Sequence, residues 1–207
     1  MTDEKSLADR ISEQTTTSDS HSAHQTPGRR RWTDVLVHRW PTALGIAVAA
    51  LAAFDLQDGL EFATLIILMA LVYLGAAALD RRWSAWAVLL AGLLLAFFIP
   101  STSEVVPSVV LLVAALVFLA LGVARGQLRE PGGLTLQTAG MLAFGSTALV
   151  ALYVNPALGG KLVAVALIGH AAWDAYHFMR NKVVSRSYAE FCGVVDLLLG
   201  VAILFMT

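Results

Sequence analysis

Three ionisable side chains, those of His170, Asp174 and His177, recur at intervals of four and three residues in an otherwise apolar segment. At 100° per residue these positions fall within about 60° of one another on successive turns of a helix. A charged side chain at the centre of a bilayer costs roughly 3 kcal/mol on insertion scales, so such residues usually face a cavity or a partner. The spacing therefore predicts a polar site on one face of a membrane helix.

A divalent metal ion is one cofactor that this site could hold. One ion cannot take both imidazoles, because the alpha carbons of His170 and His177 would lie about 10 Å apart along the axis. The ion would use His170 with Asp174, or Asp174 with His177. Asp196 or Glu190, farther along the chain, would complete the ligand set. Mixed histidine and carboxylate ligation suits zinc, iron or manganese.

A proton relay is the alternative chemistry for the same residues. His170, Asp174 and His177 would descend in steps of about 5–6 Å, which suits proton transfer through intervening waters. An outer acidic group, Asp55 and Glu61, could form the opposite end of the path. The lack of polar residues across the middle of the preceding apolar runs argues against a continuous path. A structural hydrogen-bond network that locks two helices together is the third interpretation.

The elements that must position these residues are long apolar runs. The chain has 207 residues, of which 57% are hydrophobic and 14% charged, whereas soluble domains carry about 25% charged residues. Most of the runs approach the roughly 20 residues that a helix needs to cross about 30 Å of hydrocarbon. They span residues 42–56, 60–79, 83–99, 105–124, 134–154, 158–179 and 187–206. Since lipid offers no hydrogen bonds to backbone groups, we expect an all-α bundle of seven transmembrane helices.

The basic residues predict the orientation of this bundle. Seven spans with the amino terminus inside leave only Lys161 in an outer loop, as the positive-inside rule requires, and place the carboxyl terminus outside. The basic residues on the inner side are then Arg29, Arg30, Arg31, Arg39, Arg81, Arg82, Arg125, Arg129, Arg180, Lys182 and Arg186. The sequence thus predicts a multi-pass protein of a cell membrane, with the lipid bilayer as its partner.

The amino-terminal segment has a different composition. Residues 1–31 are rich in Ser, Thr, Asp, Glu and Gln, and they lack the apolar content that would order them. We expect residues 1–38 to form a disordered cytoplasmic tail and residues 39–207 to form the transmembrane domain. A formal net charge of −1 gives no indication of nucleic-acid binding, and the single cysteine, Cys192, excludes an internal disulfide.

The last two predicted helices should lie side by side, because a short connection makes them antiparallel neighbours. Counting about 1.5 Å per residue from the inner boundary places His170 and Asp196 both about 13 Å deep, and Glu190 about 4 Å deep. A buried carboxyl group needs a hydrogen-bonding partner. We therefore expect Asp196 to bond to His170, directly or through one water. Trp173 and Tyr176 flank the polar face, as an interfacial aromatic belt or as a pocket wall.

Resemblance to known families bears on the architecture of the chain and implies no activity. The chain is not similar to microbial rhodopsins, since its last helix lacks the required lysine. It resembles membrane hydrolases of the alkaline ceramidase and adiponectin receptor group only in helix number. The closing hairpin, with His170, Trp173-Asp174, His177, Phe191-Cys192 and Asp196, resembles small bacterial multi-pass membrane proteins that share a His-x-x-Trp-Asp-x-x-His pattern. That likeness covers about the last forty residues, and it implies that the hairpin is a unit.

These observations leave three functions open. The first is an intramembrane site for a metal or a small ligand on the last two helices, with His170, Asp174 and Asp196 as primary residues and His177 and Glu190 as secondary ones. The second is a proton-coupled transporter that uses the same residues as a relay. The third is an accessory membrane protein with a structural polar hairpin.

Overall fold

The computed structural model describes residues 39–54, 56–98, 105–130 and 132–206. Within these ranges the chain forms seven α-helices, two short 3-10 turns and no strand. The helices are α3 (Trp40–Ala53), α4 (Ala63–Leu79), α5 (Ser84–Phe98), α6 (Val105–Ala124), α7 (Leu134–Tyr153), α8 (Pro156–Arg180) and α9 (Arg186–Met206). The all-α prediction is therefore confirmed for this part of the chain. The expected tail, residues 1–38, and Asp55 lie outside the described residues.

Five of the described helices are long and apolar enough to cross a membrane, which suggests a membrane protein. These are α4, with the 3-10 turn that precedes it, and α6 to α9, at 20 to 25 residues each. The helices α3 and α5 are apolar but shorter, at 14 and 15 residues. At about 1.5 Å per residue they extend only about 21 and 22 Å.

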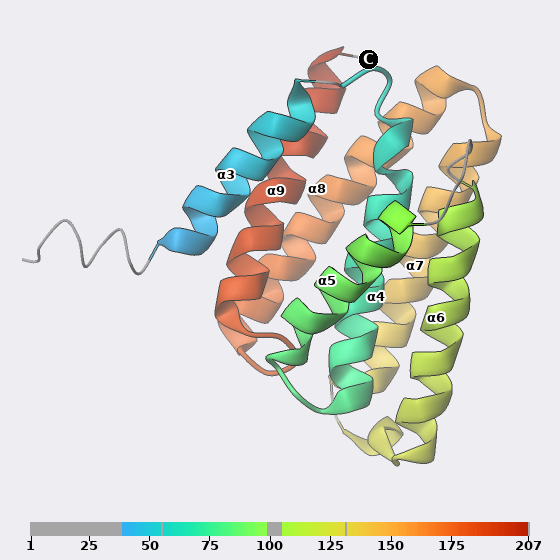
Figure 1. The fold of residues 1–207 in the computed structure, drawn as a ribbon, viewed down its shortest axis with the longest axis vertical. Helices are drawn as coiled ribbons and strands as arrows, with labels where there is room; N and C mark the ends of the chain where they lie inside the picture. Colours follow the sequence, from blue (N-terminus) through green and yellow to red (C-terminus); the bar gives the residue numbers. More distant parts are fainter. Residues whose placement is uncertain (1–38, 55, 99–104, 131, 207) are drawn as a thin grey trace, which may run out of the picture. The chain divides into compact units, whose positions relative to one another are not determined.

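Helix α4 is the centre of the described bundle. All but two of its 17 residues are buried. It packs against α5, α6, α7 and α8, while α3 packs against α9 (Figure 1). A helix that is apolar on all sides is stable only where other elements surround it, as they do here. Any polar side chain on α4 is therefore directed into the protein.

Local sequence sets the ends of α8 and α9. The side chain of Asn155 accepts a hydrogen bond from the backbone N–H of Leu158 at 3.0 Å, and Pro156 occupies the first turn, where its missing N–H costs nothing. Asn181 ends α8 in the left-handed conformation, with φ at 47°. Ser185 then caps α9, because its Oγ accepts from the N–H of Tyr188 at 3.3 Å.

The close contact between α8 and α9 depends on two glycines of α9. A Cβ at Gly200 would lie 2.9 Å from the backbone oxygen of Ala164, and a Cβ at Gly193 would lie 3.2 Å from the Cβ of Asp174. Small residues allow membrane helices to approach in this way. Asp196 lies between the two glycines in sequence and on the same stripe of α9. The glycines thus bring Asp196 close to α8.

Three connections lie together at one end of the bundle. Arg82, between α4 and α5, donates to the backbone oxygen of Asn181, between α8 and α9, at 3.0 Å. Lys182 forms an ion pair with Glu130, between α6 and α7, at 3.6 Å. The basic residues of these connections therefore share one end of the bundle.

Candidate functional site

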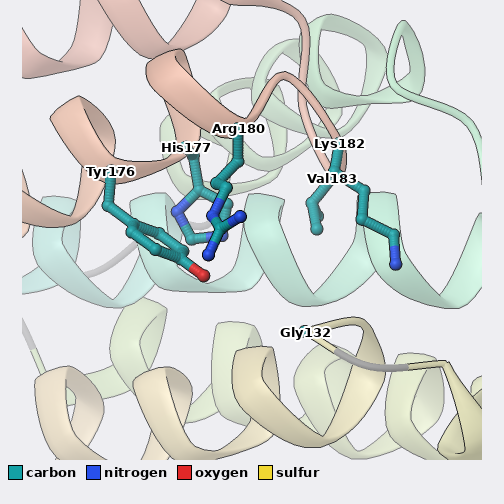
Figure 2. Close-up of a pocket in the computed structure, with 6 residues that line it drawn as sticks. All are labelled: Gly132, Tyr176, His177, Arg180, Lys182 and Val183. Carbon is teal, nitrogen blue, oxygen red and sulfur yellow. The ribbon is translucent and has the colours of Figure 1, made fainter.

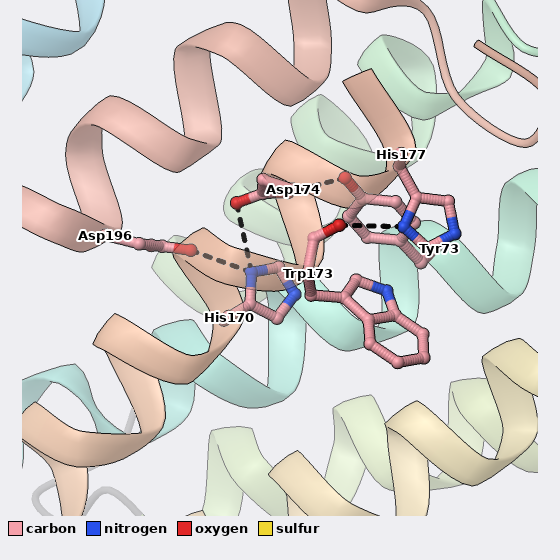
Figure 3. Close-up of polar contacts among 6 residues, drawn as sticks. All are labelled: Tyr73, His170, Trp173, Asp174, His177 and Asp196. Atoms are coloured by element: carbon pink, nitrogen blue, oxygen red, sulfur yellow. Dashed lines mark hydrogen bonds and ion pairs between the residues drawn. The ribbon is translucent and has the colours of Figure 1, made fainter. Parts of the chain in front are cut away.

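His170, Asp174 and Asp196 meet in the interior, where each side chain is at most 1% exposed. The Nδ1 atom of His170 lies 2.8 Å from Oδ2 of Asp196 and 3.3 Å from Oδ2 of Asp174 (Figure 3). The predicted contact between Asp196 and His170 is therefore confirmed as a direct hydrogen bond. We refer to these three residues as the triad.

The geometry of the triad suits a shared cation. One ligand atom from each residue can be chosen so that all three lie within 4.8 Å of one another. An ion about 2.0–2.2 Å from each donor separates its ligand atoms by roughly 3.0–3.5 Å. The two distances from His170 Nδ1 lie near this range, so small shifts of the side chains would admit an ion.

Three atoms of the triad also lack hydrogen bonds. Within the described part of the chain, Nε2 of His170, Oδ2 of Asp174 and Oδ1 of Asp196 make no hydrogen bond, although Oδ2 of Asp174 forms an ion-pair contact with His170. A buried polar atom without a partner costs about 1–3 kcal/mol. Two carboxylates also face one imidazole, and uncompensated charge in a low-dielectric interior is costly. A divalent cation or two added protons would neutralise the triad.

Tyr73 of α4 completes the surroundings of Asp174. Its hydroxyl donates to Oδ1 of Asp174 at 2.5 Å, and its side chain is 1% exposed. This bond fixes one carboxylate oxygen and turns the other toward His170 (Figure 3). Tyr73 was not among the predicted site residues, because it lies within an apolar run. Its hydroxyl was the one signal in the sequence, since a buried tyrosine hydroxyl usually needs a hydrogen-bonding partner.

Aromatic rings enclose His170. The ring of Phe144 on α7 lies 4.9 Å from the imidazole, and that of Tyr73 lies 5.6 Å away, both in edge contacts. Tyr188 of α9 lies 5.9 Å from Tyr73. Cys192 is fully buried one turn from Asp196 on α9. Apolar surroundings of this kind strengthen every electrostatic interaction within the triad.

His177 is also buried, but the structure keeps it apart from the triad. Its Nδ1 lies 2.9 Å from the backbone oxygen of Trp173, and its Nε2 lies 2.9 Å from the side-chain nitrogen of Gln137 on α7. A carbonyl oxygen can only accept, so Nδ1 carries the hydrogen and Nε2 accepts from the amide. Both ring nitrogens of a neutral imidazole are then engaged. Of the two predicted histidines, the structure brings only His170 to a candidate metal site.

Glu190, the other secondary residue of the sequence analysis, contacts α3 instead of the triad. Its Oε1 accepts hydrogen bonds from the hydroxyl of Thr42 and from Nη1 of Arg39, the latter at 3.3 Å. The outer acidic group is only partly described. Glu61 accepts a hydrogen bond from the backbone N–H of Gln57 at 3.0 Å, within the turn between α3 and α4.

The two aromatic residues that flank the polar face have different surroundings. Trp173 packs over Gly140 of α7, where an added Cβ would lie 2.9 Å from the indole ring. Tyr176 lines a cavity next to His177. The first therefore contributes to packing between α7 and α8, and the second fits the expectation of a pocket wall.

No protein-family model, curated protein or solved structure matches the chain. The chemistry of the site is therefore argued from its own residues. Three protein ligands around one ion would leave a coordination position open, which is the arrangement of catalytic metal sites.

Proposed function

We propose that this chain is a multi-pass protein of a cell membrane in which the triad binds one divalent transition-metal ion. The observation that supports this proposal is the convergence of three buried potential ligands, with their ligand atoms within 4.8 Å and three of their polar atoms without a hydrogen bond among the described residues. One divalent ion would balance two carboxylates and a neutral imidazole. Zinc, iron and manganese suit this mixed ligand set.

Each residue has a defined role in this proposal. His170 would bind the ion through Nδ1 with its hydrogen on Nε2, and metal uptake would release the protons that otherwise neutralise the triad. Asp174 and Asp196 each contribute one oxygen. Tyr73 holds the carboxylate of Asp174 in place, as outer hydrogen bonds commonly do at metal sites. A water or a substrate group takes the open position, where the ion could activate it for hydrolysis or hold it as a ligand.

The membrane orientation is part of the proposal. Seven spans with the amino terminus inside would place the connections that carry Arg82, Arg129 and Lys182 on the inner side, and the shared end of these connections supports that arrangement. Reporter fusions after these three residues should read inside, and fusions after Gln57 and Asn155 should read outside. A carboxyl-terminal fusion that reads cytoplasmic would contradict seven spans.

We also propose that the closing hairpin is related to that of small bacterial multi-pass membrane proteins.

A proton-coupled transporter is the second candidate. It is favoured by the position of the Tyr73 ring, which contacts both histidines, with centroid distances of 5.6 Å to His170 and 4.7 Å to His177. The buried pair Thr64 and Ser108 is the next polar contact along α4, nine residues and about 13 Å away. This gap argues against a continuous path. Uptake that follows an imposed proton gradient and is lost in Asp174→Asn would favour transport over a resident metal.

The metal proposal is tested on detergent-purified protein. The chelated protein is titrated calorimetrically with Zn²⁺, Mn²⁺ or Fe²⁺, and its metal content before chelation is measured by mass spectrometry. We expect about one ion per chain in the wild type and none in Asp174→Asn or His170→Ala. Glu190→Gln is the matched control, since it removes a carboxylate that contacts α3, and it should retain the ion. Absence of a bound ion, or equal loss in the control, would overturn the proposal and favour a structural hairpin.

A further inference from the structure

A cavity of about 380 Å³ lies where the end of α8 faces the beginning of α7. Its walls are Gly132, Tyr176, His177, Arg180, Lys182 and Val183. Figure 2 shows the side chains of Tyr176, His177 and Arg180 extending from α8 toward the segment that contains Gly132. The volume lies within the range of about 300–1,000 Å³ that small-molecule sites occupy.

The cavity combines two permanent positive charges with a hydroxyl donor. Among the described residues Arg180 has no acidic partner, and its guanidinium lies 5.5 Å from the centroid of the Tyr176 ring, which holds it over the cavity. Lys182 pairs with Glu130 at 3.6 Å, but both side chains are more than half exposed. Such exposed pairs contribute about 0–1 kcal/mol, so a bound anion can compete with Glu130 for the ammonium group.

The charged residues around the cavity also favour an anionic ligand. At this end of the bundle the three connections and the residues at their edges carry only two acidic residues, Asp80 and Glu130. They carry seven basic residues: Arg81, Arg82, Arg125, Arg129, Arg180, Lys182 and Arg186. Charge of one sign around a cavity raises the local concentration of oppositely charged ligands. His177, which also lines the cavity, adds no charge, because its hydrogen bonds to Gln137 and Trp173 fit a neutral imidazole.

We propose that this cavity binds a phosphate-bearing ligand, with Arg180, Lys182 and Tyr176 as its anchors. A guanidinium matches two phosphate oxygens at once, an ammonium group adds a point charge, and the phenol donates one further hydrogen bond. The phosphate belongs to an anionic lipid headgroup or to a soluble phosphate compound. No residue of the triad lines the cavity, so this inference is independent of the metal.

The experiment has one arm for each source of phosphate. In the first, inorganic phosphate is titrated into detergent-purified protein, and binding is measured by calorimetry. In the second, the protein is reconstituted into phosphatidylcholine vesicles with and without phosphatidylglycerol, and co-purified lipid is measured by native mass spectrometry. Arg180→Gln combined with Lys182→Gln should weaken binding at least about tenfold in whichever arm shows it, since hydrogen bonds to charged groups are the strong ones.

The matched control is Arg125→Gln combined with Arg129→Gln, which removes the same charge from the same end but not from the cavity. Binding in the first arm identifies a soluble phosphate compound, and selective retention of phosphatidylglycerol identifies a lipid headgroup. Equal weakening in the control pair would show attraction to the charged end as a whole and would overturn the proposal. Absence of binding in both arms would also overturn it. Thermal unfolding of each variant without ligand verifies that the fold is intact.

Discussion

His170 and His177 lie two turns apart on the same helix, and both are buried, yet their surroundings differ in kind. The polar neighbours of His177 are an amide and a carbonyl oxygen, which satisfy both ring nitrogens of a neutral imidazole. The polar neighbours of His170 are two carboxylates, and its Nε2 makes no hydrogen bond among the described residues. Both ring nitrogens of His177 are therefore satisfied, whereas one ring nitrogen of His170 is not.

This difference shows that burial of a histidine in a membrane helix does not by itself indicate a functional site. Neutral partners for both ring nitrogens of His177 join α7 to α8. Two carboxylates beside one imidazole at the triad would be balanced by a bound cation, which is the basis of the metal proposal. Substitutions that change one of the two environments and leave the other intact should therefore have different effects.

The largest effect should come from removing a carboxylate of the triad. Asp196→Asn keeps the shape of the side chain but removes its charge. We expect metal affinity to fall more than about 100-fold, which exceeds the usual loss when a residue that only hydrogen-bonds to a metal ligand is changed. His177→Gln removes the other buried histidine and should change affinity by less than about threefold. Calorimetric titration of both variants measures their metal affinities. Similar losses in the two variants would show that the histidine environments are equivalent.

The second effect concerns stability without metal. With a chelator present, His170→Ala should lower the free energy of unfolding by about 3 kcal/mol, because it leaves two buried carboxylates without their imidazole partner. Asp196→Ala should cost less, because Asp174 remains 3.3 Å from Nδ1 of His170 and one buried carboxylate is removed. The double variant should lose clearly less than the sum, since the hydrogen bond between the two side chains is then lost only once. Reversible unfolding in mixed micelles gives the three values. Additive losses would contradict a direct interaction between the two side chains.

Tyr73→Phe should have an intermediate effect. It removes the hydroxyl that orients Asp174 and leaves the ring in place, so we expect metal affinity to fall by about 10-fold or more, within the range of outer-residue changes. Tyr188→Phe is a suitable control, because that residue lies on α9 in the same aromatic group. An unchanged affinity in Tyr73→Phe would remove the positioning role from Tyr73.

The smallest effect should follow Gln137→Leu. The substitution leaves Nε2 of His177 without its donor, and we expect a loss of about 1 kcal/mol in the free energy of unfolding with no change in metal affinity. Chemical denaturation and titration of the same sample separate the two quantities. A weakened metal site in this variant would mean that the two environments are coupled.

The contact between His170 and Asp196 could be predicted from the sequence, because counting residues along two neighbouring helices gave the depth of both side chains. A short connection made α8 and α9 antiparallel, and 1.5 Å per residue placed both side chains at one depth. The same counting placed Glu190 near the site in depth only. Depth along a helix does not give the direction in which a side chain points, and Glu190 points toward Thr42 and Arg39.

The contribution of α4 could not be predicted in the same way. Tyr73 is distant from the hairpin in sequence, and no short connection fixes α4 against α8. Its contact with Asp174 depends on α4 being the central helix of the bundle, which no local pattern reveals. Gln137 lies on α7, which a two-residue connection joins to α8, so depth counting could place it near the level of His177 but could not give the direction of its side chain. The apolar runs predicted the helices well, but α3 is shorter than its expected span, because it ends at Ala53 with Phe54 as its C-cap.

X-ray diffraction from crystals grown with Zn²⁺ or Mn²⁺ would show whether an ion binds at the triad and not at His177. An anomalous difference map recorded at the absorption edge of the metal locates the ion independently of the protein coordinates. We expect one peak within about 2.0–2.2 Å of Nδ1 of His170 and of one oxygen each from Asp174 and Asp196. A map with no peak at the triad, or with its peak at His177, would exclude metal binding by these three residues.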